Sequence, residues 1–141
     1  MSGIFSDPRV QEGGNLALDA ERLERDGRIA DARACYVDAA ARYHAAAISV
    51  AAAPKARAVI AVSAVCYAAR GGRFDRAVEY AERFLAEPGS YGDEGARSLE
   101  SLLADFRRAM APTPAATEHG GGLRPPRWRE GIREKYRREA A

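Results

Sequence analysis

The sequence predicts an all-α fold of antiparallel helical hairpins, and two stretches of similar design are the main evidence. Each stretch follows an alanine-rich segment and contains a corner glycine, Gly27 or Gly72, then an apolar residue two positions later and an alanine five positions later. Glycine can adopt the positive φ that a tight helical corner requires, and alanine lets two helices approach closely. Alanine also has the highest helix propensity, so the alanine-rich composition favours helices throughout.

Five helices are expected between residues 15 and 110, because apolar side chains there repeat every three or four positions. The expected helices cover residues 15–26, 29–53, 55–70, 74–87 and 94–110. Pro54 is expected at the corner after the second helix or in the first turn of the third, since proline interrupts a helix interior. Residues 1–13 show no helical period, and we expect them to form an irregular arm.

The end of the chain differs in composition from its body. Residues 1–110 carry 15 Lys and Arg against 16 Asp and Glu, whereas residues 124–141 carry 7 against 3, and the whole chain has a net charge of +2. Residues 111–126 are rich in Pro, Thr, Gly and Ala, which predicts a linker. The sequence is therefore divided into the arm, a helical domain at 14–110, this linker and a basic tail at 127–141.

The tail is predicted to form a short amphipathic helix. Trp128, Ile132 and Tyr136 are four residues apart and would lie on one helical face. Basic residues, among them Arg137 and Arg138, surround this apolar stripe. An apolar stripe with a basic rim is typical of a helix that binds in a groove, so these five residues are candidate partner-binding residues.

The two hairpins resemble tetratricopeptide repeats, in which each 34-residue unit has small and aromatic residues at fixed positions. The matching residues of the first hairpin are Ala20, Gly27, Ile29, Ala32, Tyr36 and Ala39. Those of the second hairpin, with the alanine and the aromatic residue in reversed order at the last two positions, are Val65, Gly72, Phe74, Ala77, Ala81 and Phe84. The corner glycines are 45 residues apart, so the first repeat must have a longer second helix or a longer loop.

The resemblance covers residues 14–110 and implies a short solenoid of two repeats and a capping helix. It also implies a concave surface, lined mostly by the first helix of each hairpin, that binds a peptide or helix of another protein. The expected function is thus that of a non-enzymatic adaptor or scaffold, and Arg57, Arg70 and Arg73 are expected to contact an acidic ligand on that surface. Two alternatives share the helical pattern: a microtubule-interacting-and-trafficking domain, which resembles the first hairpin, and a plain helical bundle.

Residues that build catalytic or metal sites are scarce in this sequence. His44 and His119 are its two histidines, and neither has a cysteine or carboxylate at metal-ligand spacing. Cys35 and Cys66 lie in alanine-rich segments without a neighbouring histidine, which predicts reduced, packed thiols. The glycine pairs lack the lysine and the hydroxyl residue of a phosphate-binding loop. We therefore expect no enzyme activity and no catalytic, cofactor or metal site.

The partner of the tail is left open by the sequence. The tail could dock on another protein or on a second copy of this chain, giving a homo-oligomer, or fold back on its own domain as a sixth helix. Its arginines could instead contact nucleic-acid phosphates, although three interleaved glutamates argue against that alternative. A further alternative is a helical subunit of a larger enzyme complex.

The sequence also predicts where the protein resides. The longest apolar stretch, at residues 45–53, is far shorter than the roughly 20 residues that a bilayer span requires. No apolar segment of the kind that a secretory signal contains is present. We therefore expect a cytoplasmic protein that does not bind membranes.

Overall fold

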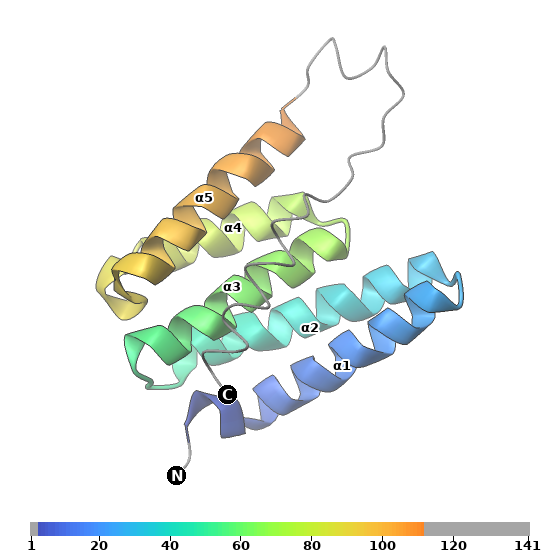
Figure 1. The fold of residues 1–141 in the computed structure, drawn as a ribbon, viewed down its shortest axis with the longest axis horizontal. Helices are drawn as coiled ribbons and strands as arrows, with labels where there is room; N and C mark the ends of the chain where they lie inside the picture. Colours follow the sequence, from blue (N-terminus) through green and yellow to red (C-terminus); the bar gives the residue numbers. More distant parts are fainter. Residues whose placement is uncertain (1–2, 112–141) are drawn as a thin grey trace.

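The structure is a computed structural model that describes residues 3–111 and shows five α-helices and no strand within that range (Figure 1). The predicted all-α class is thus confirmed. The helices, including two short 3-10 helices, are η1 (Ile4–Ser6), α1 (Pro8–Arg25), α2 (Ile29–Ser49), α3 (Pro54–Arg70), α4 (Phe74–Leu85), η2 (Pro88–Ser90) and α5 (Gly92–Met110). Residues 112–126 of the predicted linker and the whole predicted tail lie outside the described residues.

Successive α-helices run antiparallel, so that α1, α3 and α5 share one direction and α2 and α4 run the opposite way (Figure 1). Helix α3 lies at the centre, because it packs on α2, α4 and α5, whereas α1 packs mainly on α2. Every α3 residue from Ala58 to Ala69 is buried except Ser63. Most of these side chains are small, so the core depends on close approach of the helices, and larger side chains such as Phe84 and Phe106 fill the spaces between them.

The two corner turns predicted from the sequence have the same backbone geometry. Gly27 and Gly72 have φ of 78° and 80°, the left-handed conformation that glycine adopts without strain. In each turn the residue after the glycine donates its backbone N–H to a carbonyl five residues earlier, at 2.9 Å from Arg28 to Leu23 and at 2.9 Å from Arg73 to Ala68. These bonds satisfy carbonyls that the ends of α1 and α3 would otherwise leave unpaired.

The N-terminal segment differs from the expected irregular arm. Within residues 3–13 the structure has η1 and the first turns of α1, so that prediction was wrong for this segment. The side chain of Asp7 caps α1 by accepting a hydrogen bond of 2.9 Å from the backbone N–H of Arg9. Gly13 is a packing position inside the helix, because an added Cβ would lie 3.1 Å from the ring of Tyr43. Tertiary packing therefore outweighs the low helix propensity of glycine.

Three other helix boundaries shift by a few residues. Helix α2 ends at Ser49 instead of continuing through residue 53, and Pro54 occupies the first turn of α3, one of its two predicted positions. Proline disfavours the helical conformation in the preceding residue, and Ala53 accordingly has φ of −59° and ψ of 146°. Helix α4 ends at Leu85, and α5 begins at Gly92, whose φ is 71°.

Candidate docking groove

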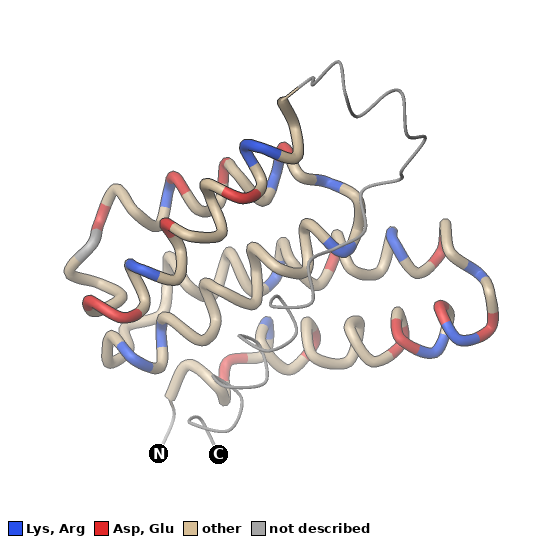
Figure 2. Tube along the Cα trace, turned by 45° about the horizontal axis from the view of Figure 1, so that its top comes forward, with Lys and Arg blue, Asp and Glu red and all other residues tan. Residues whose placement is uncertain are grey.

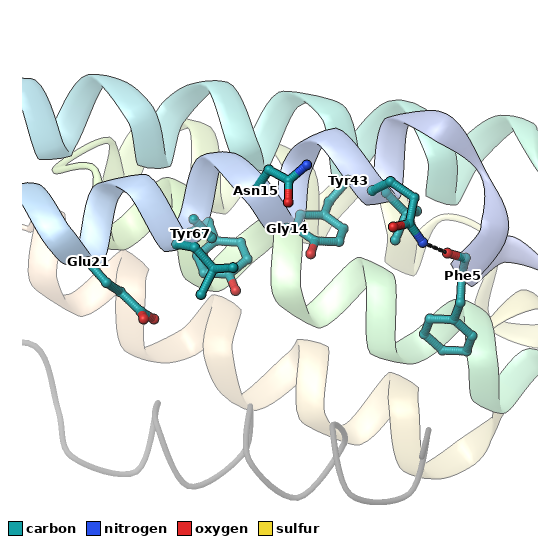
Figure 3. A pocket seen from close by; sticks show the side chains of 10 residues that line it. Phe5, Gly14, Asn15, Glu21, Tyr43 and Tyr67 are labelled. Atoms are coloured by element: carbon teal, nitrogen blue, oxygen red, sulfur yellow. Dashed lines mark hydrogen bonds between the residues drawn. The ribbon is translucent and has the colours of Figure 1, made fainter.

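A groove of about 430 Å³ lies beside α1, at the side of this helix that faces α3 (Figure 3). Helix α1 contributes one of its faces, which includes Val10, Gly14 and Ala17. These positions repeat every three or four residues, so they lie on one side of the helix. The floor of the groove is formed by two tyrosines, Tyr43 from α2 and Tyr67 from α3. With Phe5 from η1, the groove therefore draws residues from three α-helices and one 3-10 helix.

The two floor tyrosines are held by stacking and by glycine. Their ring centroids are 5.4 Å apart, and Tyr67 stacks in turn on Tyr36 at 5.9 Å. Offset stacking of this kind stabilises aromatic pairs beyond the area that they bury. Tyr43 reaches the groove because α1 has glycine where the ring passes: an added Cβ at Gly13 would lie 3.1 Å from the ring, closer than ordinary van der Waals contact, whereas one at Gly14 would make an ordinary contact of 3.5 Å with the hydroxyl. Gly13 thus makes room for the floor of the groove.

An ion-pair network closes the end of this aromatic row. The guanidinium of Arg70 lies 4.4 Å from the centroid of the Tyr36 ring and is 3.0 Å from a carboxylate oxygen of Glu24. The same arginine is 3.8 Å from Glu21, which lines the groove. The Tyr36 hydroxyl donates a hydrogen bond to Glu24. Burial and this hydrogen bond raise the pKa of Tyr36 well above its ordinary value, so the hydroxyl remains protonated.

Charged residues of both signs lie near the groove. Figure 2 shows that the charged residues of α1 gather in its C-terminal half, next to the turn into α2. Among the described residues that line the groove, Glu21 is the charged one, and the others are apolar, amide-bearing or tyrosine side chains. Leu18, on the rim, is 55% exposed. The lining of the groove is thus mixed, with exposed Gln11 and Asn15 beside exposed Leu18. At its end Glu21 and Glu24 share the guanidinium of Arg70, which leaves this cluster a net charge of −1.

The three arginines predicted to bind a partner are not brought together. Arg57 is in the first turn of α3 and Arg70 in its last, about 20 Å apart at 1.5 Å per residue. Arg57 donates hydrogen bonds of 3.2 Å to the carbonyl of Ala47 and 2.9 Å to that of Val50, so it caps the end of α2. Arg73 is 2.8 Å from its neighbour Asp75 at the start of α4. None of the three lines the groove.

The other candidate residues, in the predicted tail, lie outside the described residues: Trp128, Ile132, Tyr136, Arg137 and Arg138. Sequence reasoning missed Leu18, Tyr43 and Tyr67 as functional candidates. The sequence contains one indication of the groove. Gly13 and Gly14 precede a segment with helical periodicity, and glycine in a helix indicates that a large side chain packs closely there. The identity of that side chain could not be inferred, since it comes from another helix.

The titratable groups of the described residues do not form a reactive cluster. No group of three or more His, Cys, Asp and Glu residues between positions 3 and 111 is placed to hold a metal ion. Neither Cys35 nor Cys66 forms a disulfide in the described part of the chain, and burial, with nearby carboxylates led by Asp19, raises the pKa of Cys35. The His44 ring stacks on Tyr80 at 4.2 Å, and burial, together with the charge of Arg83, lowers the pKa of His44. Both shifts, that of Cys35 and that of His44, favour the neutral form of the side chain.

Over the described part of the chain, no helix has the length and apolar character needed to cross a membrane. Comparison of the chain with protein-family models, with curated proteins and with solved structures found no match. The inference of function therefore rests on the groove and the fold.

Proposed function

We propose that this chain is a non-enzymatic adaptor that binds a helix or peptide of another protein in the groove beside α1. We also propose that its hairpins are stacked in the manner of tetratricopeptide repeats. The repeated turn geometry at Gly27 and Gly72 supports this arrangement, as does the common direction of α1, α3 and α5. In such a stack the first helix of each hairpin lies on one face, and that face carries the groove.

The observation that carries the proposal is the groove with its stacked tyrosine floor. Tyr43 and Tyr67 are 9% and 4% exposed, so the stacked rings form a rigid floor. Binding a helix in a groove typically uses two or three apolar anchors spaced by one helical turn. The volume of about 430 Å³ suits a few such side chains. The exposed side chain of Leu18 extends the same apolar surface at the rim.

The groove also indicates the chemistry of the partner segment. Its lining has one carboxylate, that of Glu21, and no basic residue among the described positions. A matching segment would therefore have apolar or aromatic anchors and a basic rim. This differs from the acidic ligand expected from the three arginines, because Arg57, Arg70 and Arg73 already have partners within the chain.

The experiment that tests the proposal is partner capture from the source cell with matched surface variants of the full chain. Leu18→Glu places a second carboxylate on the rim of the groove. Ile29→Glu is the control, because Ile29 is 47% exposed and does not line the groove. The proposal predicts a stoichiometric protein partner with the wild-type chain and with Ile29→Glu, and its loss with Leu18→Glu. Equal recovery by both variants, or recovery of nucleic acid alone, would overturn it.

A further inference from the structure

We infer that the groove is occupied by residues 127–139 of the same chain when no partner is bound. This inference rests on the proposed function in one respect, namely that the groove is a docking surface for a helix or peptide. It goes further by identifying one occupant and the way in which a partner would gain access. Partner binding would then be a competition with the tail.

The first argument is complementarity between the groove and the sequence of the tail. The groove offers accessible apolar surface from half-buried Phe5 and exposed Leu18 above the tyrosine floor, with the amides of Gln11 and Asn15 beside them and the carboxylate of Glu21 at the end. The tail has Trp128 and Tyr136, with an isoleucine midway between them, at intervals of four residues. Such spacing presents one large apolar side chain per helical turn.

The second argument is charge. Residues 124–141 contain seven basic and three acidic residues, so this segment is a net cation. The groove has no basic residue among its described lining residues, and at its end Glu21 and Glu24 share Arg70, at 3.8 and 3.0 Å, so that this cluster has a net charge of −1. Opposite charges at the rim of a groove favour one binding partner over others and speed its association. The segment of this chain with the chemistry that the groove selects is thus the tail.

The third argument is reach. Residues 112–126 separate the end of the described chain from the tail, and a flexible chain of this length spans on average about 20 Å and at most about 50 Å. The helical domain has a radius of gyration of about 13 Å, the value expected for some 110 residues. The linker is therefore long enough to bring the tail to the groove from the end of α5.

The same linker favours the chain's own tail over that of a second copy. A short flexible linker gives an effective concentration of about 1 mM, so even a segment with an intrinsic Kd of about 0.1 mM would be docked about 90% of the time. A second copy present at micromolar concentration would compete about a thousandfold less well. Occupancy within one chain is thus expected without dimerisation.

The test uses Trp128, the single tryptophan of the chain, as an internal reporter. Its fluorescence emission and its quenching by acrylamide are measured in the full chain without any partner, beside a synthetic peptide of residues 123–141. If the tail is docked, emission from the full chain lies at shorter wavelength and the quenching constant is severalfold smaller than that of the peptide. Leu18→Glu is expected to raise the quenching constant toward the value of the peptide, whereas Ile29→Glu leaves it unchanged.

Two further measurements make the outcome decisive. Circular dichroism of each variant shows whether the fold is kept, which is expected because both replaced side chains are exposed. Light scattering over about a hundredfold dilution is expected to give the mass of one chain, 15.2 kDa, with unchanged quenching. The inference is overturned if Trp128 in the full chain is quenched like the peptide, if folded Leu18→Glu behaves as the wild type, or if protection disappears on dilution.

The fluorescence test and the capture test fail independently. Because the fluorescence measurement contains no partner, an exposed Trp128 refutes occupancy by the tail and leaves partner capture standing. Conversely, if Leu18→Glu recovers the same amount of partner protein as the wild type, the proposed function is refuted, even where the groove protects Trp128 from quenching.

Discussion

Arg70 and Tyr36 form a cation–π pair in which the guanidinium carbon lies 4.4 Å from the ring centroid. The pair joins the last turn of α3 to α2, and the carboxylate of Glu24 extends it to α1 through contacts with both residues. Three helices therefore meet at one cluster, whose arginine side chain is only 13% exposed. Arg70, which the sequence analysis expects to contact a ligand, therefore stabilises the end of the groove through contacts within the chain.

The first prediction is that Arg70→Ala lowers the free energy of unfolding by about 1–3 kcal/mol. The change removes a cation–π contact and a hydrogen bond to a charged group, which together contribute on this order when partly buried. Arg73→Ala is the control, because the Arg73 side chain is 43% exposed and pairs with Asp75 at the surface, where solvent screens the ion pair, so a much smaller loss is expected. Urea unfolding of both variants would refute the structural role if the two losses were equal.

The second prediction concerns the close approach of helices after the first turn. Ala32 is 1% exposed, so Ala32→Leu forces three additional carbon atoms into a packed space and should lower the free energy of unfolding by about 1–3 kcal/mol. Ala30→Leu is the matched control, because Ala30 is exposed in the same turn of α2. Thermal melts should show a lower Tm for the first variant only. An unchanged Tm for Ala32→Leu would mean that this position is not a helix contact.

The third prediction is a loss of stability on mild acidification, caused by His44. Burial, together with the charge of Arg83, lowers the pKa of His44 below its ordinary value of 6.5, and its Nε2 has no hydrogen-bond partner among the described residues. The folded chain therefore binds this proton less readily than the unfolded chain does. The contribution of His44 is fully present above about pH 6.5 and is lost as the pH falls toward the pKa of the folded state.

The measurement is the free energy of unfolding in urea as a function of pH for the wild type and for His44→Phe. Phenylalanine keeps a ring beside Tyr80 and removes the titrating nitrogen, and both proteins retain His119. The difference between the two curves should be constant above about pH 6.5 and should change in favour of His44→Phe below it. Parallel curves at all pH values would show that His44 does not titrate differently on folding.

The helical hairpins could be predicted from the sequence because their signals are local. Glycine at positions 27 and 72 fixes the corner conformation, and alanine at position 32 marks a helix contact, whatever the rest of the chain does. The start of α1 could not be predicted in the same way. Gly13 and Gly14 have low helix propensity, and it is the ring of Tyr43 on another helix that explains glycine at position 13.

The groove could not be predicted from the sequence either, because it depends on contacts between different helices. Its floor depends on the stacking of Tyr43 on Tyr67, two residues whose separation in the sequence contains no indication of contact. The intramolecular contacts of the predicted arginines could not be inferred from the sequence, because Arg57 pairs with a carbonyl of Val50 and Arg70 with the carboxylate of Glu24, both on other elements. Charge in a sequence thus shows that a residue can form an ion pair, and tertiary structure decides with which group.

The most direct test of the groove as a docking surface is site-specific photo-crosslinking in the source cell. A photoreactive amino acid replaces Leu18 on the rim of the groove or, in a matched chain, Ile29 outside it. The groove proposal predicts that position 18 forms a covalent adduct with a defined segment of one partner protein, and that position 29 does not. Identical adducts from both positions, or an adduct from position 29 alone, would contradict it.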